Sequence, residues 1–307
     1  MVTPNVSFLQ PNDLLQKWSS MKYLTALVIG LWVTPLWIAK AETGTDEFAN
    51  LEKRTDGRIG IAAIDVATNR QVEYHGQERF LMCSTFKVLA VAAVLKRVDE
   101  KKEKLDRFVR YGEAQLLEHA PVTRAHVKAG GMTLDALCAA AIEQSDNTAA
   151  NLILETIGGP KGVTDFARAL GDEFTRLDRT EPELNVASPG DERDTTAPGS
   201  MCKDLQRLFT SDVLSRESQG RLEGWMVANE TGAKMIRASV PADWRVGDKT
   251  GRSGKGATND IAILRPPTGG PFFVAIYIDA PSESSGGGDP LVAEAAKIAI
   301  ELLKKKE

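Results

Sequence analysis

The stretch FLMCSTFKVLAVAAVLKR, from Phe80 to Arg97, contains one serine and one lysine at the start of an otherwise apolar run. From Thr85 onward, apolar residues fall on nearly every side of a helix, which is typical of a helix buried in a protein core. Ser84 and Lys87 are three positions apart, so a helix places the hydroxyl and the amine on the same face. The stretch therefore predicts a core helix with two polar, reactive groups at its N-terminal end.

This Ser-x-x-Lys spacing also has ordinary explanations. Serine is a preferred residue at helix starts, because its oxygen accepts a hydrogen bond from a free backbone N–H group. A lysine can bury its methylene stem and extend its ammonium group to water. The same spacing occurs again at Ser19 and Lys22. The spacing alone therefore does not distinguish a helix cap from a reactive pair.

Composition narrows the classes of function. The chain has 307 residues, 42% of them hydrophobic, and a net charge of −4, which suits one or two globular domains with a substantial core. The slight acidity argues against nucleic acid or an anionic membrane as a partner. The cysteines are Cys83, Cys138 and Cys202, and neither a Cys-x-x-Cys motif nor a zinc-type histidine spacing occurs. We therefore expect neither a metal nor a cofactor.

Residues 21–41, MKYLTALVIGLWVTPLWIAKA, have the layout of a secretory signal peptide: a short positive start, an apolar stretch and an A-x-A cleavage site. A membrane anchor is the alternative, but Pro35 and an apolar length of about 16 residues argue against it, since a span needs about 20. Residues 1–20 lack this pattern and are interpreted as an upstream extension that need not be translated. We expect an exported, periplasmic protein that begins near Glu42 and has no stable membrane anchor.

The periodicity of the mature chain predicts strands near both of its ends and helices between them. The expected strands are GRIGIAAIDV (57–66), RQVEYH (70–75), WRVGDKTG (244–251), NDIAILRPP (259–267) and PFFVAIYIDA (271–280), and the closing helix is PLVAEAAKIAIELLKKKE (290–307). This order indicates an α+β fold, with a five-stranded antiparallel sheet in a three-layer α/β/α arrangement and an all-helical domain. We expect the α/β domain to comprise 42–80 and 227–307, and the helical domain 81–226. A ligand cleft should lie between them.

Two further motifs are weak signals when taken alone. Ser145-Asp146-Asn147 stands just before a helical pattern and reads as a helix cap. Lys249-Thr250-Gly251 stands at the end of a strand and reads as a turn with an exposed lysine. In chain order with Ser84 and Lys87, however, they form the marker set of class A β-lactamases and penicillin-binding proteins. The separations between the motifs also resemble those of class A enzymes.

The stretch TRLDRTEPELNVASPGDERDTTAP, residues 175–198, is similar to the Ω-loop of class A β-lactamases nearly residue for residue. Arg179 and Asp194 match the ion pair that closes this loop, which we therefore place at 179–194. Glu181 and Asn185 match the motif that holds the deacylating water. The chain thus resembles class A serine β-lactamases over essentially its whole mature length, and this implies the serine β-lactamase/DD-peptidase-like fold.

The resemblance implies a role for each site residue. Ser84 is the expected nucleophile, and Ser145 is expected to pass a proton to the leaving lactam nitrogen. Glu181 is expected to activate the deacylating water, while the acylation base, Lys87 or Glu181, stays open. The remaining residues are expected to bind substrate or water: Asn147, Asn185, Lys249, Thr250, Gly251, Arg252 and His119. His119 is explained equally well as a plain surface histidine.

Two departures from the family pattern and one feature of its loop lead to specific predictions. The stretches GATNDIA and SSGGGDPLVAE lack the arginine that commonly binds the substrate carboxylate, so Arg252 is the candidate substitute. Several carbapenem-hydrolysing members pair the equivalent of Cys83 with a cysteine where this chain has Ser253, so carbapenem hydrolysis is not implied. We accordingly expect Cys83, Cys138 and Cys202 to be unpaired and buried. We also expect a cis bond between Glu181 and Pro182.

Three rival functions share part of this pattern. A D-alanyl-D-alanine peptidase has the three motifs but lacks the deacylating glutamate. A β-lactam sensor domain stays acylated and should follow a membrane span, and a serine-type glutaminase has no reason to carry this Ω-loop. We therefore expect an exported, monomeric enzyme that opens the β-lactam ring of penicillins and cephalosporins, and whose partner is this small-molecule substrate.

Overall fold

The computed structural model describes residues 45–186, 188, 190–280 and 287–305. The expected upstream extension and signal peptide, residues 1–41, lie outside the described residues. Within the described part of the chain, no helix combines the length and apolarity needed to cross a membrane.

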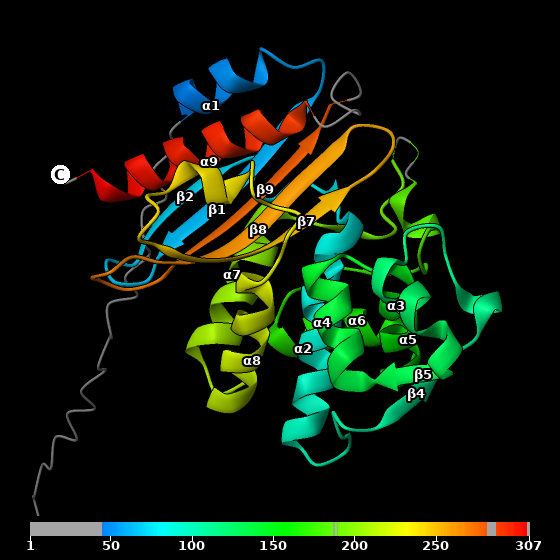
Figure 1. Cartoon of the computed structure of the whole chain (residues 1–307). Coiled ribbons are helices and arrows are strands. Elements are labelled where there is room, and N and C mark those ends of the chain that lie inside the picture. Colours follow the sequence, from blue (N-terminus) through cyan, green and yellow to red (C-terminus); the bar gives the residue numbers. More distant parts are fainter. Residues whose placement is uncertain (1–44, 187, 189, 281–286, 306–307) are drawn as a thin grey trace, which may run out of the picture. The chain divides into compact units, whose positions relative to one another are not determined.

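The centre of the molecule is a five-stranded antiparallel sheet (Figure 1). Its strands, in spatial order, are β2 (Arg70–Tyr74), β1 (Arg58–Asp65), β9 (Phe272–Asp279), β8 (Ala257–Arg265) and β7 (Arg245–Arg252). The two N-terminal strands therefore pair directly with the three C-terminal ones, through the contact of β1 with β9. The predicted fold class and all five predicted strands are confirmed, with ends that differ by one or two residues.

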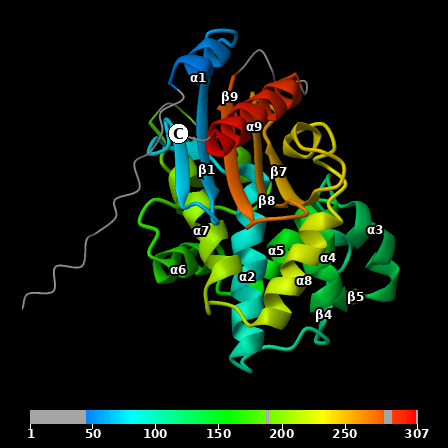
Figure 2. The ribbon, with the colours of Figure 1, turned by 90° about the vertical axis from the view of Figure 1, so that its left-hand side faces the viewer.

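Both faces of the sheet are buried along β1, β8 and β9, because successive side chains of a strand point to opposite faces. In β9, Val274 and Ile276 belong to one apolar cluster, whereas Phe273 and Tyr277 belong to the other. The first cluster is covered by α9 (Gly288–Lys304), on which α1 (Thr45–Glu52) packs. The second is covered by α7 (Pro198–Thr210) and α8 (Arg216–Val227). Figures 1 and 2 show these two helical layers on opposite sides of the sheet.

A helical region lies beyond the second face and packs around α2 (Phe86–Asp99), the predicted core helix. Residues Phe86 to Leu95 of α2 are all buried, which explains why its sequence is apolar on nearly every side. The other helices of this region are α3 (Pro121–His126), α4 (Leu134–Glu143), α5 (Asn147–Thr156) and α6 (Pro160–Leu170).

The sequence analysis missed two short ladders. Strand β3 (Phe80–Leu81) pairs with β6 (Thr195–Thr196), and β4 (Phe108–Arg110) pairs with β5 (Gly131–Thr133). Two or three residues are too few to show an alternating pattern, so such pairs exist only because the tertiary fold brings the segments together. The β3–β6 pair matters for the site, because it ties the segment before Ser84 to the end of the Ω-loop.

Candidate active site

Ser84 lies in a turn of 3₁₀-helix, Cys83–Thr85, which leads directly into α2. The N-cap of α2 is Thr85, and Ser84 does not cap it. Instead, the Ser84 hydroxyl donates a hydrogen bond of 3.4 Å to Glu181 Oε1. Cys83, just before it, has a φ of 46°, a left-handed conformation that is costly for a residue with a side chain. The backbone is thus bent so that Ser84 faces the Ω-loop.

Lys87 is fully buried and has oxygen neighbours from three residues of the site. Its ammonium group donates to Asn147 Oδ1 at 2.7 Å and to the Ser145 carbonyl at 2.8 Å, and lies 3.1 Å from Glu181 Oε1. Burial lowers the pKa of Lys87, and the neighbouring Glu181 carboxylate opposes that shift. Among the described contacts, Lys87 therefore meets Ser84 through Glu181 rather than by a direct hydrogen bond.

Ser145 lies between the two site lysines, as expected. Its hydroxyl oxygen is 3.1 Å from Lys249 Nζ and 3.4 Å from Lys87 Nζ. Ser145 has a φ of 56°, a second left-handed position at the site. Asp146 is the N-cap of α5 and accepts from the Ala149 N–H group at 2.9 Å. The helix-cap interpretation of this motif is therefore correct for Asp146, while Ser145 faces the lysines.

Lys249 and Gly251 belong to β7, where backbone pairing with β8 holds the chain straight. The Lys249 ammonium group is buried and donates to the Ser145 hydroxyl and, at 2.9 Å, to the Thr250 carbonyl. Burial, and then the charge of Lys87, lower the pKa of Lys249 to about 7. A side-chain carbon on Gly251 would come within 2.6 Å of the Met82 carbonyl. A glycine is therefore what lets this strand lie against the Ser84 turn.

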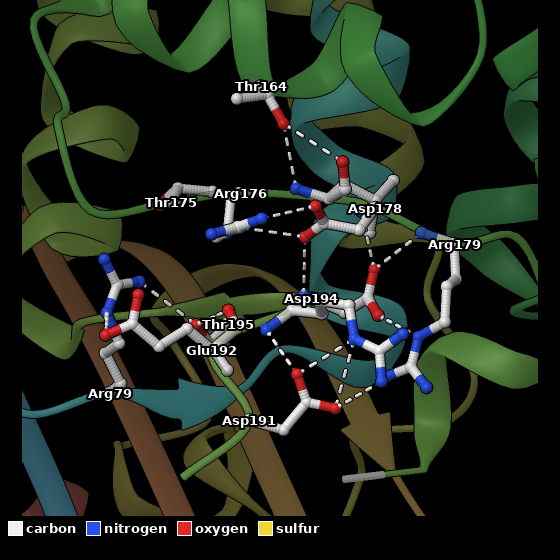
Figure 3. Close-up of polar contacts among 12 residues, drawn as sticks. Arg79, Thr164, Thr175, Arg176, Asp178, Arg179, Asp191, Glu192, Asp194 and Thr195 are labelled. Carbon is white, nitrogen blue, oxygen red and sulfur yellow. Dashed lines mark hydrogen bonds and ion pairs between the residues drawn. The ribbon is translucent and has the colours of Figure 1, made fainter.

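The neck of the Ω-loop is closed by charged and backbone contacts (Figure 3). Asp194 is fully buried, and Arg179 Nε donates to its Oδ2 at 2.6 Å. The other oxygen of Asp194 accepts the backbone N–H groups of Asp178 and Arg179 at 2.8 and 2.9 Å. Arg176 pairs in turn with Asp178 at 2.7 Å. The predicted closing pair is confirmed.

Inside the loop, Glu181 is buried and held from both of its ends. Its backbone N–H donates to Asn151 Oδ1, and its carbonyl accepts from Asn151 Nδ2, both at 2.9 Å. Asn185 Nδ2 donates to Glu181 Oε2 at 2.6 Å. The Glu181–Pro182 peptide bond is cis, as predicted. Asn151 was not singled out in the sequence, although it stands four positions after Asn147 and so shares its helix face.

His119 and Arg252 lie at the edge of this arrangement. His119 is exposed, and its Nε2 lies 3.1 Å from the Gln144 carbonyl oxygen. The backbone carbonyl of His119 accepts a hydrogen bond from the Asn147 N–H at 2.9 Å. His119 is thus next to the Ser145–Asn147 segment. Arg252 ends β7, and its Nη1 is 2.5 Å from Asp289 Oδ1. The substitute arginine therefore already has an anionic partner from the protein.

A polar layer behind Lys249 was missed in the sequence. Asp248 is buried and accepts from Arg237 and, at 2.5 Å, from Asn229. Asn229 Oδ1 accepts from the Thr231 hydroxyl, which is 2.5 Å from the Thr250 hydroxyl. Burial raises the pKa of Asp248. The contacts to Asp248 and Thr250 join residues 11 or 19 positions apart in the sequence, so no local motif signals their network.

The three cysteines are unpaired and buried, as predicted. Burial raises the pKa of each thiol, which makes it a poor nucleophile. In the described part of the chain, no group of three or more histidine, cysteine or acidic residues is arranged to hold a metal ion.

The sequence matches the model of the family described as "Beta-lactamase enzyme family" over residues 44–303. It is 43% identical to β-lactamase OXY-2 of Klebsiella oxytoca over 284 residues, which cover 92% of this chain and 98% of that protein. The solved structure of an ancestral (GNCA) class A β-lactamase matches with a TM-score of 0.81 and 52% identity, and covers 84% of this chain and 98% of its own. The solved structure of PenP from Rhodopseudomonas palustris, titled a putative class A β-lactamase, matches with a TM-score of 0.81 and 47% identity over the same shares. The chain therefore belongs to the class A β-lactamase family.

Proposed function

We propose that this enzyme hydrolyses penicillins and cephalosporins in two steps, through an ester on Ser84 that water cleaves with the help of Glu181. As a class A β-lactamase, the protein acts on β-lactams and so serves in antibiotic resistance. The observation that carries the proposed mechanism is the contact of Glu181 with both the Ser84 hydroxyl and Lys87. The proposal adds to the family assignment which atoms carry out each step.

In acylation, Ser84 Oγ bonds to the lactam carbonyl carbon and loses its proton to a base. Glu181 Oε1 accepts the hydrogen bond of this hydroxyl directly, at 3.4 Å. Lys87, whose ammonium group lies 3.1 Å from Glu181 Oε1, is suited to stabilising the charge on Glu181. The geometry of the free enzyme thus favours Glu181 as the first proton acceptor, with Lys87 as its counter-ion. Without Glu181, the buried Lys87 loses the carboxylate that keeps its pKa up, so its free amine can replace this base in acylation.

Opening of the ring breaks the bond between the carbonyl carbon and the lactam nitrogen, and the nitrogen must then gain a proton. Ser145 is suited to deliver it, because its hydroxyl lies between the ammonium groups of Lys87 and Lys249. The backbone N–H groups of Ser84 and Arg252 are the proposed oxyanion hole, in which pre-aimed donors stabilise the developing charge. Lys249 and Thr250 would meet the substrate carboxylate, and Asn147 its side-chain carbonyl.

Deacylation requires a water molecule with a base beside it. Glu181 and Asn185 are joined at 2.6 Å, so an amide and a carboxylate converge next to the ester position. Glu181 takes a proton from the water, which attacks the ester carbon and releases Ser84. Removing a positioned general base typically costs about 10²- to 10⁴-fold in rate. That loss should fall mainly on this second step.

The test is a trapping experiment with Glu181→Ala and benzylpenicillin. We expect mass spectrometry to show this variant heavier by one whole penicillin for minutes or longer, while the wild type shows little adduct. Glu183→Ala is the matched control, because Glu183 is an exposed acid two positions along the same loop. It should turn over like the wild type, and Ser84→Ala should form no adduct.

Each outcome assigns a role. An unmodified Glu181→Ala protein would mean that the glutamate is also needed for acylation and that Lys87 cannot replace it. Rapid turnover by Glu181→Ala would refute its hydrolytic role. A wild-type protein that stays acylated after one turnover would instead favour a penicillin-binding or sensor protein.

Export and oligomeric state are also part of the proposal. The layout of residues 21–41 supports secretion to the periplasm and cleavage after Ala41. The two apolar clusters account for the burial of the sheet within a single chain, which supports a monomer. N-terminal sequencing and the mass in solution of the protein from a periplasmic fraction test both points. A mature N-terminus at residue 1 or 21 would refute the cleavage.

A further inference from the structure

The side chain of Arg252 is bound to an acid that comes from the far end of the chain. Arg252 is the last residue of β7, directly after Lys249-Thr250-Gly251. Its Nη1 lies 2.5 Å from Oδ1 of Asp289, the second residue of α9. The Arg252 side chain is 38% exposed and that of Asp289 only 15%. This ion pair therefore lies at the end of the strand proposed to hold the substrate carboxylate, partly open to solvent.

A close backbone contact brings the two residues together. Arg252 pairs with Thr258 in the ladder between β7 and β8. A side-chain carbon on Gly288 would be only 2.7 Å from the hydroxyl of Thr258. The first turn of α9 thus rests directly on this end of the sheet, which sets Asp289 beside Arg252.

The negative charge of Asp289 is compensated by Arg252. Its Oδ1 is buried and has no hydrogen-bond partner among the described residues, so the cation of Arg252 is what faces it. An acid in the first turn of a helix is also favoured by the helix dipole, which is a purely structural reason for Asp289. The two explanations differ in one respect: only the ion pair links Asp289 to the charge of the substrate.

Building on the proposed function, we infer that Asp289 is a specificity-determining residue, which sets how strongly Arg252 attracts the substrate carboxylate. Asp289 cancels much of the charge of Arg252 and occupies one arm of its guanidinium group, leaving other N–H donors for a ligand. A carboxylate beside the binding position also repels an anionic substrate directly. The pair thus tunes binding of the anion, while Lys249 and Thr250 supply the fixed part of that site.

The inference predicts an order of KM values for benzylpenicillin. Asp289→Asn keeps the shape of the side chain and releases the cation, so KM should fall by about two- to fivefold, the range for a partly exposed ion pair. Arg252→Ala should raise KM by up to about tenfold, because it removes the cation and leaves Asp289 uncompensated. The double variant Arg252→Ala/Asp289→Asn should lie between them. The kcat should change less than KM in each case.

The experiment compares benzylpenicillin with its methyl ester, which lacks the carboxylate charge. For the ester, Asp289→Asn should leave KM unchanged. Glu294→Gln is the matched control, since Glu294 is on the same helix and pairs with the distant Arg54. Melting temperatures of all variants separate a change in binding from a loss of folded protein.

Unchanged KM values for Asp289→Asn with benzylpenicillin would overturn the inference. So would equal effects on the acid and its ester, because these would indicate a structural role for Asp289 in α9. Failure of the proposed function is distinguishable, since the wild-type protein would then not turn over benzylpenicillin at all.

Discussion

The Ω-loop and strand β7 each deliver a charged side chain to Ser84, but they are held in different ways. The loop positions Glu181 through side-chain contacts: the buried pair of Asp194 with Arg179, and the two hydrogen bonds between Asn151 and the Glu181 backbone. The strand positions Lys249 through a continuous backbone ladder with β8 and a close approach to the Ser84 turn at Gly251. In the loop, therefore, single polar side chains fix the position of Glu181. In the strand, backbone pairing and close packing fix the position of Lys249.

This difference has a consequence for mutation. Removing one polar contact from the loop should release Glu181 while the rest of the fold persists, because the sheet and its two layers do not depend on that contact. The strand does not depend on a single polar contact of this kind. The position of Lys249 should change only where the close approach of β7 to the Ser84 turn is blocked. Each of the following predictions tests one side of the comparison.

The largest effect is expected from Gly251→Ala in the strand. The new carbon would lie 2.6 Å from the Met82 carbonyl, so either β7 or the Ser84 turn must move. A shift of about 1 Å can cost about 10²-fold in kcat/KM, and overpacking about 1–3 kcal/mol in the free energy of unfolding. The control is Gly254→Ala, because a side-chain carbon at Gly254 would meet no atom within 4 Å. Equal activity of the two variants would contradict the role of close packing.

The second prediction concerns Arg179→Ala in the loop neck. Breaking a buried pair costs about 2–3 kcal/mol here, at the low end because Asp194 keeps two backbone donors. Deacylation should slow more than acylation, because the loop carries Glu181, and urea unfolding with stopped-flow kinetics measures both. Arg193→Ala removes an exposed pair with Asp191 and should cost less than about 1 kcal/mol. A larger loss for Arg193→Ala would mean that the neck is held differently.

The third prediction is a pH dependence at the entry to the loop. Asp172 accepts the N–H groups of Phe174 and Thr175, at 2.7 and 3.1 Å. The fully buried Asp204 has no hydrogen-bond partner for either carboxyl oxygen among the described residues. Burial, and then the charge of Asp172, raise the pKa of Asp204 well above its usual value, against the opposing cations Arg207 and Arg168. An acid with a raised folded-state pKa binds more protons when folded, so its effect is to lower stability as pH rises above its unfolded pKa of about 4.

Asp204→Asn removes this titration and keeps the shape of the side chain. Its advantage in unfolding free energy over the wild type should grow by up to about 1.4 kcal/mol per pH unit above about pH 4. Urea unfolding of both proteins at several pH values measures the difference. A constant difference across that range would show that Asp204 is ionised in the folded protein.

The smallest effect is expected for Lys249 in the strand. Because its pKa is lowered to about 7, its charge is present below that pH and is lost above it. The KM for benzylpenicillin should therefore rise by about threefold to tenfold between about pH 7 and pH 9. Lys249→Arg keeps a cation throughout this range and should show a flatter profile. The same rise in both proteins would assign the titration to another group.

Much of this molecule was predictable from local sequence. Runs of consecutive apolar residues predicted the strands β1, β8 and β9, because strands buried on both faces have apolar side chains pointing to both sides. The all-apolar run after Ser84 predicted α2 for a similar reason. The site motifs and the Ω-loop were recognised as well, since each lies within a short segment. Asp194 and Arg179 were paired from that resemblance.

The sequence by itself determined which helices and strands form and which types of reactive groups are present, because both follow from neighbouring residues. The tertiary structure alone decided which groups meet. In it, the Ser84 hydroxyl donates to Glu181 rather than contacting Lys87, and the polar network of Asp248 lies behind Lys249. The tertiary structure also paired Arg252 with Asp289, 37 positions away. Contacts of this kind depend on distances across packed layers, which no local pattern of residues encodes.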